Sequence, residues 1–294
     1  MIFFKQEKIS SAIMYVFLGV IIALPLILIL SLVIKSGNIV QTNSISDLLF
    51  STDWKPFQGK FGFASYIYSS VLVTLLSLII AVPLCLLTAI YLTYYARSVY
   101  LKVMQPLIDI LAGIPSIIYG VWGVLIIVPL ISKHIAPFFG IESTGFSVFA
   151  GAVVLAVMIT PFILNILIEI FKSISKELPE ASIALGATKW QTIKFVVLRK
   201  SFSGIVSAVV FGLSRAFGET IAVLMVVGNV AQIPSDIFQP AYPLPALIAN
   251  NFGEMLSIPG YESALMFAAL ILLVIVMLFN LAARWLISRY EVKV

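Results

Sequence analysis

The sequence predicts an all-α integral membrane protein with six transmembrane helices, and three observations support this fold class. The chain has 294 residues, of which 61% are apolar and 11% charged, and its mean hydropathy of +1.13 is far above that of an ordinary water-soluble domain. Its apolar runs have the length, about 20 residues, at which a helix crosses a hydrocarbon core. Its basic residues are unevenly shared among the connections between these runs. The six runs are 11–34, 65–92, 107–132, 147–168, 204–229 and 264–287.

The run 11–34 follows only the segment MIFFKQEK and has no small-x-small cleavage pattern at its end. We therefore expect a retained first transmembrane helix rather than a removed signal peptide. Residues 1–10 then form a cytoplasmic N-terminus and residues 35–64 an outer loop. Residues 65–287 form a five-helix core, and residues 288–294 form a cytoplasmic C-terminus.

Lysine and arginine mark the sidedness of the chain. If Arg284, near the end of the last run, is counted with the C-terminus, thirteen of the 18 lie in the two terminal segments and in the connections 93–106 and 169–203. Four lie in the other connections, and Arg215 lies deep inside a run. By the positive-inside rule, both termini and the 169–203 connection are cytoplasmic. Because the net charge of +5 is explained by topology, we expect membrane lipid and protein partners, and no nucleic acid.

The third run, 107–132, contains three glycines within one arc of roughly 80° on a helix turning 100° per residue. They are Gly113, Gly120 and Gly123, and Pro115 frees a backbone carbonyl near the first of them. Small residues on one face let a neighbouring helix approach closely, and proline interrupts a helix. Two interpretations stay open, an interrupted helix beside a pathway and ordinary tight packing.

The connection 169–203 carries clear helix signals. Pro179 is suited to the first turn of a helix, and Gly186 interrupts the pattern. Thr188 and Gln191 have the spacing of a capping box, which begins a second helix. Its face of Trp190, Ile193 and Val197 has no domain of this chain to pack on, so we expect it to contact either a partner or the inner leaflet.

The connection 230–263 has five prolines and no basic residue. Proline fixes φ and removes a donor, so QPAYPLP predicts a shaped loop, followed by a short surface helix in PALIANNFGEM. This loop is either a docking surface for an external partner or a solvated connector.

The fifth run, 204–229, holds a charge of each sign. Arg215 and Glu219 are four residues apart, so on a continuous helix they share a face and can pair. An unpaired arginine at the membrane centre costs roughly 2.5 to 3.5 kcal/mol, so such residues face a bundle interior or a wet cavity. One hypothesis is a structural ion pair. The other is an anion gate, in which Arg215 contacts the anion and Glu219 orients Arg215, with Thr220 and Ser214 as neighbouring hydroxyls.

The residues that several other function classes need are missing from the sequence. Cys85 and His134 are the only cysteine and histidine, so the chain can build neither an intrachain disulfide nor the histidine pair of a metalloprotease. No G-x-x-x-x-G-K-[ST] loop occurs, so the chain cannot hydrolyse ATP by that chemistry. We expect a transport subunit with no catalytic residues, metal or bound cofactor.

The stretch EASIALG followed by VVL resembles the EAA signature of ABC-importer permeases, whose coupling helix docks on an ATPase subunit. Two positions depart from this signature: Ser182 replaces its second alanine, and Arg199 stands where that family usually has proline. The resemblance implies a type I permease fold with a cytoplasmic coupling helix. The ATPase-docking residues that it implies are Glu180, Ala181, Ser182, Gly186 and Ala187.

The resemblance extends to AGIPSIIYGVWGVLIIVPL, LGATKWQTIKFVVL and SRAFGETIAVLMVVGN, which are similar to permeases of the phosphate-specific importer, closer to the PstC type than to the PstA type. It implies a prokaryotic cell membrane and a substrate path that includes Arg215 and Glu219, to which we add Thr220 because it is adjacent to Glu219. It also implies three partners: a PstA-type permease, an ATPase dimer and an extracytoplasmic phosphate-binding protein. A permease for sulfate, molybdate or phosphonate and an ATP-independent secondary transporter remain as alternatives.

Overall fold

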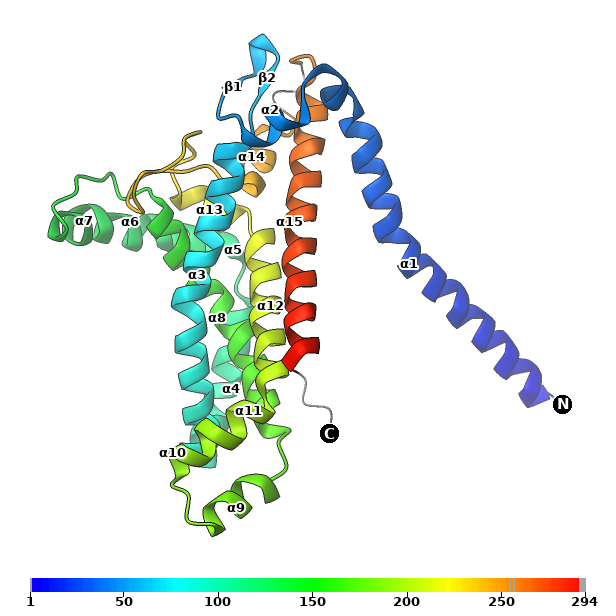
Figure 1. Cartoon of the computed structure of the whole chain (residues 1–294), viewed down its shortest axis with the longest axis vertical. Helices are drawn as coiled ribbons and strands as arrows, with labels where there is room; N and C mark the ends of the chain where they lie inside the picture. The colour runs from blue at the N-terminus through cyan, green and yellow to red at the C-terminus, as the bar shows by residue number, and fades with distance from the viewer. Residues whose placement is uncertain (1, 254, 256, 291–294) are drawn as a thin grey trace.

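The computed structural model describes residues 2–253, 255 and 257–290, and it is a bundle of long helices joined by short ones (Figure 1). The last four residues of the expected C-terminal segment 288–294 lie outside the described residues. The long helices are α1 (Ile2–Thr42), α3 (Ala64–Ile90), α4 (Ser98–Gly113), α8 (Val148–Lys172), α12 (Phe202–Gly218) and α15 (Tyr261–Tyr290).

Short elements connect or extend these helices. The short helices are α2 (Ile45–Phe50), α5 (Ser116–Trp122), α6 (Val128–Leu130), α7 (Ala136–Phe138), α9 (Glu177–Ala184), α10 (Lys189–Thr192), α11 (Leu198–Lys200), α13 (Ile221–Val226) and α14 (Leu244–Asn251). The π-helical segments are Tyr91–Tyr95, Gly123–Ile127, Ile131–Ile135 and Ile193–Val197. Strands β1 (Trp54–Lys55) and β2 (Lys60–Phe61) form an antiparallel hairpin around the 3₁₀ turn Pro56–Gln58.

Among the described residues, five helical spans are long and apolar enough to cross a membrane, and a bent pair brings the number to six. The pair joins Lys189–Lys200 to Phe202–Gly218 at an angle of 70°. The prediction of a six-helix membrane protein is thereby confirmed. The five spans are Ile13–Thr42, Ala64–Tyr95, Ser116–Phe138, Val148–Lys172 and Tyr261–Arg289.

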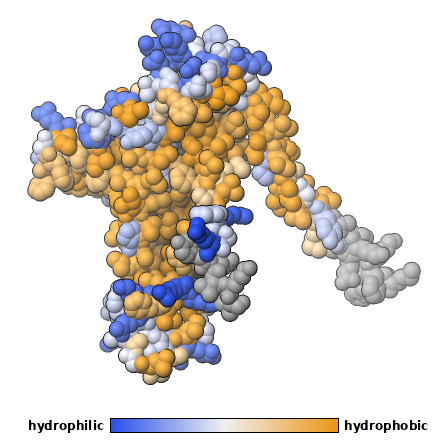
Figure 2. All heavy atoms as spheres, viewed as in Figure 1, coloured by the Kyte–Doolittle hydropathy of each residue, from blue (hydrophilic) through white to orange (hydrophobic). Residues whose placement is uncertain are grey.

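The surface has the pattern of a membrane protein. Apolar side chains cover the middle of the molecule, and hydrophilic side chains gather at its two ends (Figure 2). We name these the coupling end, which carries α9, and the hairpin end, which carries β1 and β2 (Figure 1). An apolar belt between two polar ends matches the hydrocarbon core and headgroup layers of a bilayer.

Helix α8 forms the centre of the bundle, because it packs against α3, α4 and α12. Its start is stabilised by Ser147, whose hydroxyl accepts a hydrogen bond of 3.2 Å from the Ala150 N–H. Helix α1 leans away from the bundle toward its N-terminus (Figure 1) and meets α15 near the hairpin end. There the Ile39 N–H donates to the Ser263 hydroxyl at 3.0 Å, and Lys35 pairs with Glu262 at 3.0 Å.

The third expected run is not one straight helix. Helix α4 ends at Gly113, Ile114 is extended with φ −67° and ψ 128°, and α5 begins after Pro115. Beyond α5, the segments α6 and α7 project sideways from the bundle (Figure 1). The helix is therefore interrupted at the predicted proline, and the expected span 107–132 is wrong in its bounds.

Two of the three glycines in this run also serve close packing. A Cβ atom added at Gly120 would lie 2.6 Å from the Met225 sulfur, and one added at Gly123 would lie 2.6 Å from a Val154 methyl carbon. Gly113 has nothing within 4 Å of such an atom. The prediction of a close helix approach is thus confirmed for Gly120 and Gly123 and wrong for Gly113.

We expect Gly123→Leu to destabilise the folded protein by about 1 to 3 kcal/mol, because the new side chain overpacks the contact with Val154 and Val226. The measurement is the melting temperature of the purified protein in detergent. Gly113→Ala is the matched control. It should leave the melting temperature unchanged or raise it slightly, since alanine favours a helix more than glycine does. Equal melting temperatures for Gly123→Leu and the wild type would contradict the packing role.

The proline-rich connection folds back into the bundle. Residues 241–247 are all buried, and α14 packs against α3, α13 and α15. The expected short helix in PALIANNFGEM exists as α14, but its first half is buried, so the prediction of a surface helix is wrong there. A fully solvated connector is also excluded for residues 241–247, because their neighbours on α3 supply hydrogen-bond acceptors that solvent would otherwise supply.

Candidate functional site

The fifth predicted run is broken in the region of its two charges. Helix α12 ends at Gly218, Glu219 is extended with φ −77° and ψ 128°, and α13 begins at Ile221. Glycine is a poor helix former, and Thr220 occupies the N-cap position of α13. The expectation that Arg215 and Glu219 share one helix face is therefore wrong, because the helix does not continue between them.

Arg215 has an aromatic neighbour instead of an acidic one. Its guanidinium carbon lies 4.1 Å from the centre of the Phe162 ring on α8, and the side chain is exposed on this chain. In the described part of the chain the ion pairs are Lys35–Glu262 and Lys172–Glu169, so Arg215 has no carboxylate partner there. The hypothesis of a structural ion pair between Arg215 and Glu219 is therefore wrong, and the Arg215 guanidinium is available to another anion.

Glu219 is half-buried and interacts with the start of the next helix. Its carboxylate accepts a hydrogen bond of 3.4 Å from the Ala222 N–H in the first turn of α13. Arg215 lies in the last turn of α12, where the helix dipole favours a cation, and the dipole of α13 favours an anion at Glu219. Each charge is thus stabilised by a helix end and not by the other charge.

The two hydroxyls beside this pair have different surroundings. Thr220 is half-buried, and its hydroxyl donates to the Gly218 carbonyl at 3.4 Å. Ser214 accepts a hydrogen bond of 3.3 Å from the Asn280 side chain on α15, so it ties α12 to α15. The structure brings Glu219 and Thr220 to the same helix break and places Arg215 one turn before it.

A small cavity lies beside Glu219. Its volume is about 10 Å³, enough for about one water molecule. Ser70 and Thr74 on α3 and Pro243 and Pro245 on the proline-rich segment line it together with Glu219. Sequence reasoning missed these two hydroxyls, although the series of hydroxyl residues Ser65, Ser69, Ser70, Thr74 and Ser77 in an apolar run was a visible signal.

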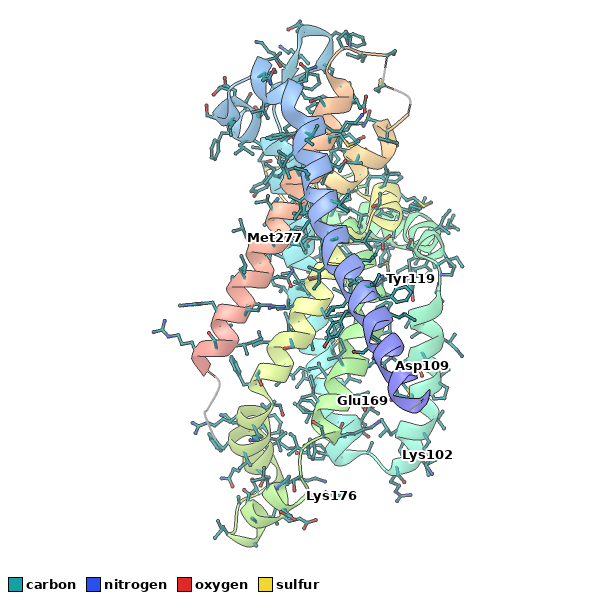
Figure 3. The ribbon with its side chains drawn as sticks, turned by 90° about the vertical axis from the view of Figure 1, so that its right-hand side faces the viewer. Lys102, Asp109, Tyr119, Glu169, Lys176 and Met277 are labelled. Carbon is teal, nitrogen blue, oxygen red and sulfur yellow. The ribbon has the colours of Figure 1, made fainter. Side chains whose placement is uncertain are left out.

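A polar cluster joins α4 to α8 nearer the coupling end. The Gln105 amide donates to Asn165 at 2.8 Å, and the Asn165 amide donates to Asp109 at 2.9 Å. Figure 3 shows Lys102 toward the coupling end and Asp109 farther along α4 toward the middle of the molecule. Sequence analysis did not single out this acid, although charged residues inside membrane spans commonly mark functional surfaces.

The 169–203 connection has the predicted helix boundaries. Pro179 lies in the first turn of α9, and Gly186 ends the element with a φ of +89° that favours glycine. The capping box is present, since the Gln191 N–H donates to the Thr188 hydroxyl at 3.3 Å and the Thr188 N–H donates to the Gln191 side chain at 2.8 Å. The predicted helix–glycine–helix elbow is confirmed.

The buried face of the elbow differs from the prediction. Ile193 and Val197 are buried within the apolar core of this chain, whereas Trp190 is 50% exposed. The π-helical segment Ile193–Val197 shifts the register after α10, so Trp190 does not share their burial. The expectation that this face has nothing in its own chain to pack on is wrong.

The apolar surface that the elbow leaves exposed belongs to α9 and the residue after it. Leu185 is 89% exposed and Ile183 is 50% exposed. Of the docking residues that the resemblance implied, Glu180, Ala181 and Gly186 are exposed, and Ser182 and Ala187 are half-buried. The Ser182 hydroxyl lies 3.0 Å from the Thr192 hydroxyl, so this departure from the EAA pattern braces α9 on α10. Sequence reasoning missed Leu185, whose place directly before Gly186 was the available signal.

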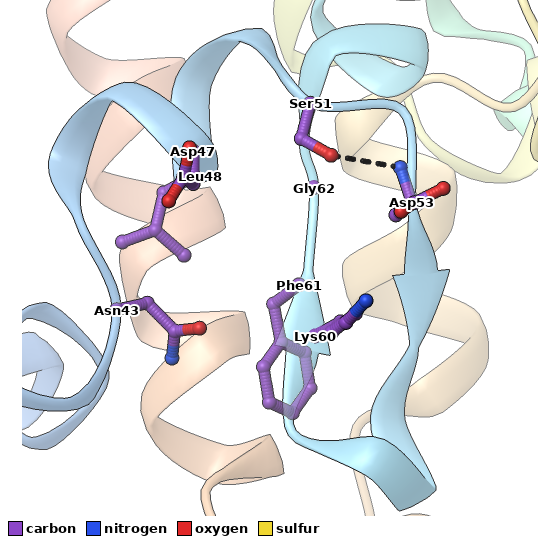
Figure 4. A pocket seen from close by; sticks show the side chains of 8 residues that line it. All are labelled: Asn43, Asp47, Leu48, Ser51, Asp53, Lys60, Phe61 and Gly62. Carbon is purple, nitrogen blue, oxygen red and sulfur yellow. Dashed lines mark hydrogen bonds between the residues drawn. The ribbon is translucent and has the colours of Figure 1, made fainter.

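A separate hollow of about 300 Å³ lies at the hairpin end (Figure 4). Asp47, Asp53 and Lys60 are among the residues that line it. The Ser51 hydroxyl accepts a hydrogen bond of 3.1 Å from the Asp53 N–H (Figure 4). This hollow shares no lining residue with the cavity at Glu219, so the two are separate.

Comparisons with known proteins agree with this architecture. Residues 81–292 match the family model described as "Binding-protein-dependent transport system inner membrane component". The chain is 39% identical to the probable ABC transporter permease protein YqgH of Bacillus subtilis (strain 168), over 93% of this chain and 88% of that protein. It is 36% identical to the phosphate transport system permease protein PstC of Pasteurella multocida (strain Pm70), over 90% of this chain and 86% of that protein.

The fold is also similar to that of solved transporters. A chain of the MetNI methionine ABC transporter in inward-facing conformations superposes with a TM-score of 0.55 at 21% identity, over 76% of this chain and 92% of that chain. At this identity the likeness concerns the fold alone, which is that of a type I ABC importer permease. This chain is thus a multi-pass transport subunit of the binding-protein-dependent transport system inner membrane component family, of the PstC type.

Proposed function

We propose that this chain is a membrane-spanning permease subunit of an ATP-driven importer of inorganic phosphate. The substrate follows from relatives such as the Pasteurella multocida PstC, which is named as a phosphate transport permease. The observation in the molecule that carries the proposal is Arg215, an arginine in the fifth apolar run with no acidic partner among the described residues. A guanidinium binds phosphate oxygens in a bidentate manner that a lysine cannot reproduce.

The passage in this proposal runs along α12 and its break, with Arg215, Glu219 and Thr220 beside it. The exposure of Arg215 on the isolated chain supports a passage shared with a second subunit, since an unpaired arginine facing lipid is costly. Glu219 carries the same sign as the substrate and so limits how tightly the anion is held. Conduction requires this, because a transport site must also release what it binds.

The assembly in this proposal has three kinds of partner. A PstA-type permease completes the passage, and an ATPase dimer binds the coupling end at Leu185 and the EAA residues. An extracytoplasmic phosphate-binding protein docks at the hairpin end, where the hollow beside Asp47 and Asp53 adds to the polar surface. The coupling end and both termini are cytoplasmic in a prokaryotic cell membrane, as the distribution of basic residues predicts.

The test is uptake by the whole complex reconstituted in liposomes with the binding protein. We expect ATP-dependent accumulation of labelled phosphate and at least tenfold less labelled sulfate. Uptake of sulfate in place of phosphate would keep the ATP-driven permease and reject the substrate. Uptake that does not depend on ATP would reject the coupling mechanism and favour a secondary transporter.

A further inference from the structure

Residues 241–247, which we name the outer plug, fill the interior of the bundle at the hairpin end. All seven residues are buried, and Leu244, Ala246 and Leu247 are at most 1% exposed. The plug enters as an extended segment and turns into α14, which packs against α3, α13 and α15. A non-helical segment is tolerated at such depth only where its backbone groups are bonded within the protein.

The backbone donors of the extended part of the plug are all accounted for. Pro243 and Pro245 have no N–H, so they leave no donor to satisfy. The Ala241 N–H donates to the Val227 carbonyl at 3.0 Å. The Tyr242 N–H donates to the Ser69 hydroxyl at 3.4 Å, and the Leu244 N–H donates to the Ser70 hydroxyl at 2.7 Å.

Ser69 and Ser70 are oriented to accept these two hydrogen bonds. Each hydroxyl donates its own proton within α3, Ser69 to the Ser65 carbonyl at 2.6 Å and Ser70 to the Tyr66 carbonyl at 2.8 Å. The lone pairs of each oxygen therefore remain for the plug. We name Ser69 and Ser70 the serine latch, because they hold a segment more than 170 residues away in the chain.

The plug also covers Glu219. Pro243 and Pro245 line the cavity at Glu219, as does Ser70 of the serine latch. A volume of about 10 Å³ holds about one water molecule, which is much less than a phosphate ion needs. Within this chain the space beside Glu219 is therefore closed to a phosphate ion, and the plug forms part of its wall.

We propose that the outer plug is the outer gate of the passage and that Ser69 and Ser70 are the positioning residues that keep it closed. This inference rests on the proposed function, because it takes Glu219 to line the substrate path. Entry of an anion from the hairpin end requires the plug to move and the two hydrogen bonds to break. Replacing both serines by alanine leaves two buried N–H groups unpaired in the closed state only, which favours the open state.

The test measures access to Glu219 from outside. The whole complex is prepared with Glu219→Cys and Cys85→Ala and reconstituted in liposomes, and a membrane-impermeant maleimide is added externally without binding protein. We expect slow labelling of this probe when the latch is intact. Ser69→Ala with Ser70→Ala should raise the labelling rate roughly tenfold or more, since each net hydrogen bond shifts an equilibrium about three- to tenfold.

Ser77→Ala is the matched control. Ser77 is equally buried on α3, but its hydroxyl donates to the Thr74 carbonyl of its own helix and not to the plug. Ser70→Thr retains a hydroxyl and serves as the conservative variant. In both variants the cysteine at position 219 should be labelled as slowly as it is when the serine latch is unchanged. A general loosening of α3 would instead speed labelling in the Ser77→Ala protein as well.

Two results would overturn the gate. One is equally slow labelling with and without the latch, and the other is fast labelling when the latch is intact. If the double variant does not assemble, Ser70→Ala alone removes the 2.7 Å bond and gives the same comparison. Labelling does not depend on the transported anion, so failure of phosphate uptake rejects the proposed substrate, whereas an unchanged labelling rate rejects the gate.

Discussion

Arg215→Gln should lower ATP-driven phosphate uptake at least tenfold while the complex still assembles. The guanidinium has no acidic partner in the described part of the chain, so its removal breaks no ion pair there and leaves the fold intact. What is lost is a bidentate donor for phosphate oxygens in a region of low dielectric, where charge-assisted hydrogen bonds are strong. The measurement is uptake of labelled phosphate by the reconstituted complex, with assembly checked by gel filtration.

The matched control for Arg215→Gln is Arg289→Gln. Arg289 also lies over an aromatic ring, with its guanidinium carbon 5.4 Å from the Trp285 ring, and its removal changes the net charge by the same amount. This control should transport at the wild-type rate. Arg215→Lys keeps the charge without the planar fork, so intermediate uptake is expected. Full uptake by an assembled Arg215→Gln complex would remove Arg215 from the passage.

Leu185→Asp should prevent the ATPase subunit from co-purifying with the permease. The Leu185 side chain is 89% exposed at the coupling end, and burying a leucine against a partner contributes about 1.5 to 3 kcal/mol. Aspartate removes this contribution and adds the desolvation of a charge. A loss of about 3 kcal/mol corresponds to more than a hundredfold weaker binding.

Phe57→Asp is the control for Leu185→Asp, because Phe57 is also 89% exposed but lies in the turn of the hairpin at the opposite end. The Phe57→Asp permease should retain its ATPase, as measured by the ratio of the two subunits after affinity purification. A normal ratio with Leu185→Asp would mean that the ATPase docks elsewhere. The α9 elbow would then be a helix on the membrane surface.

Features that depend on neighbouring residues were predictable from the sequence. The apolar runs predicted the membrane spans, because hydropathy summed over about 20 residues decides whether a helix enters a bilayer. Two further features were predictable because each depends on contacts within a few residues. They are the capping box of Thr188 and Gln191 and the helix end at Gly186, which has a left-handed conformation. Pro115 likewise marked the interruption between α4 and α5.

Other features depend on contacts between distant parts of the chain. Periodicity placed Arg215 and Glu219 on one face, but the helix ends between them and Arg215 packs on Phe162 of α8. Periodicity also placed Trp190 with Ile193 and Val197, yet only the last two are buried. Which residues of an amphipathic segment are buried depends on the helices that pack against it, and the spacing of residues within the segment does not contain that information.

The proline-rich connection shows this division most clearly. Its composition predicted a shaped loop, because proline restricts φ wherever it occurs. Only the tertiary structure decided that residues 241–247 enter the bundle, where Ser69 and Ser70 accept their N–H groups. The physical reason is that a buried backbone donor needs a hydrogen-bond partner. Here that partner is supplied by α3, which lies more than 170 residues earlier in the sequence.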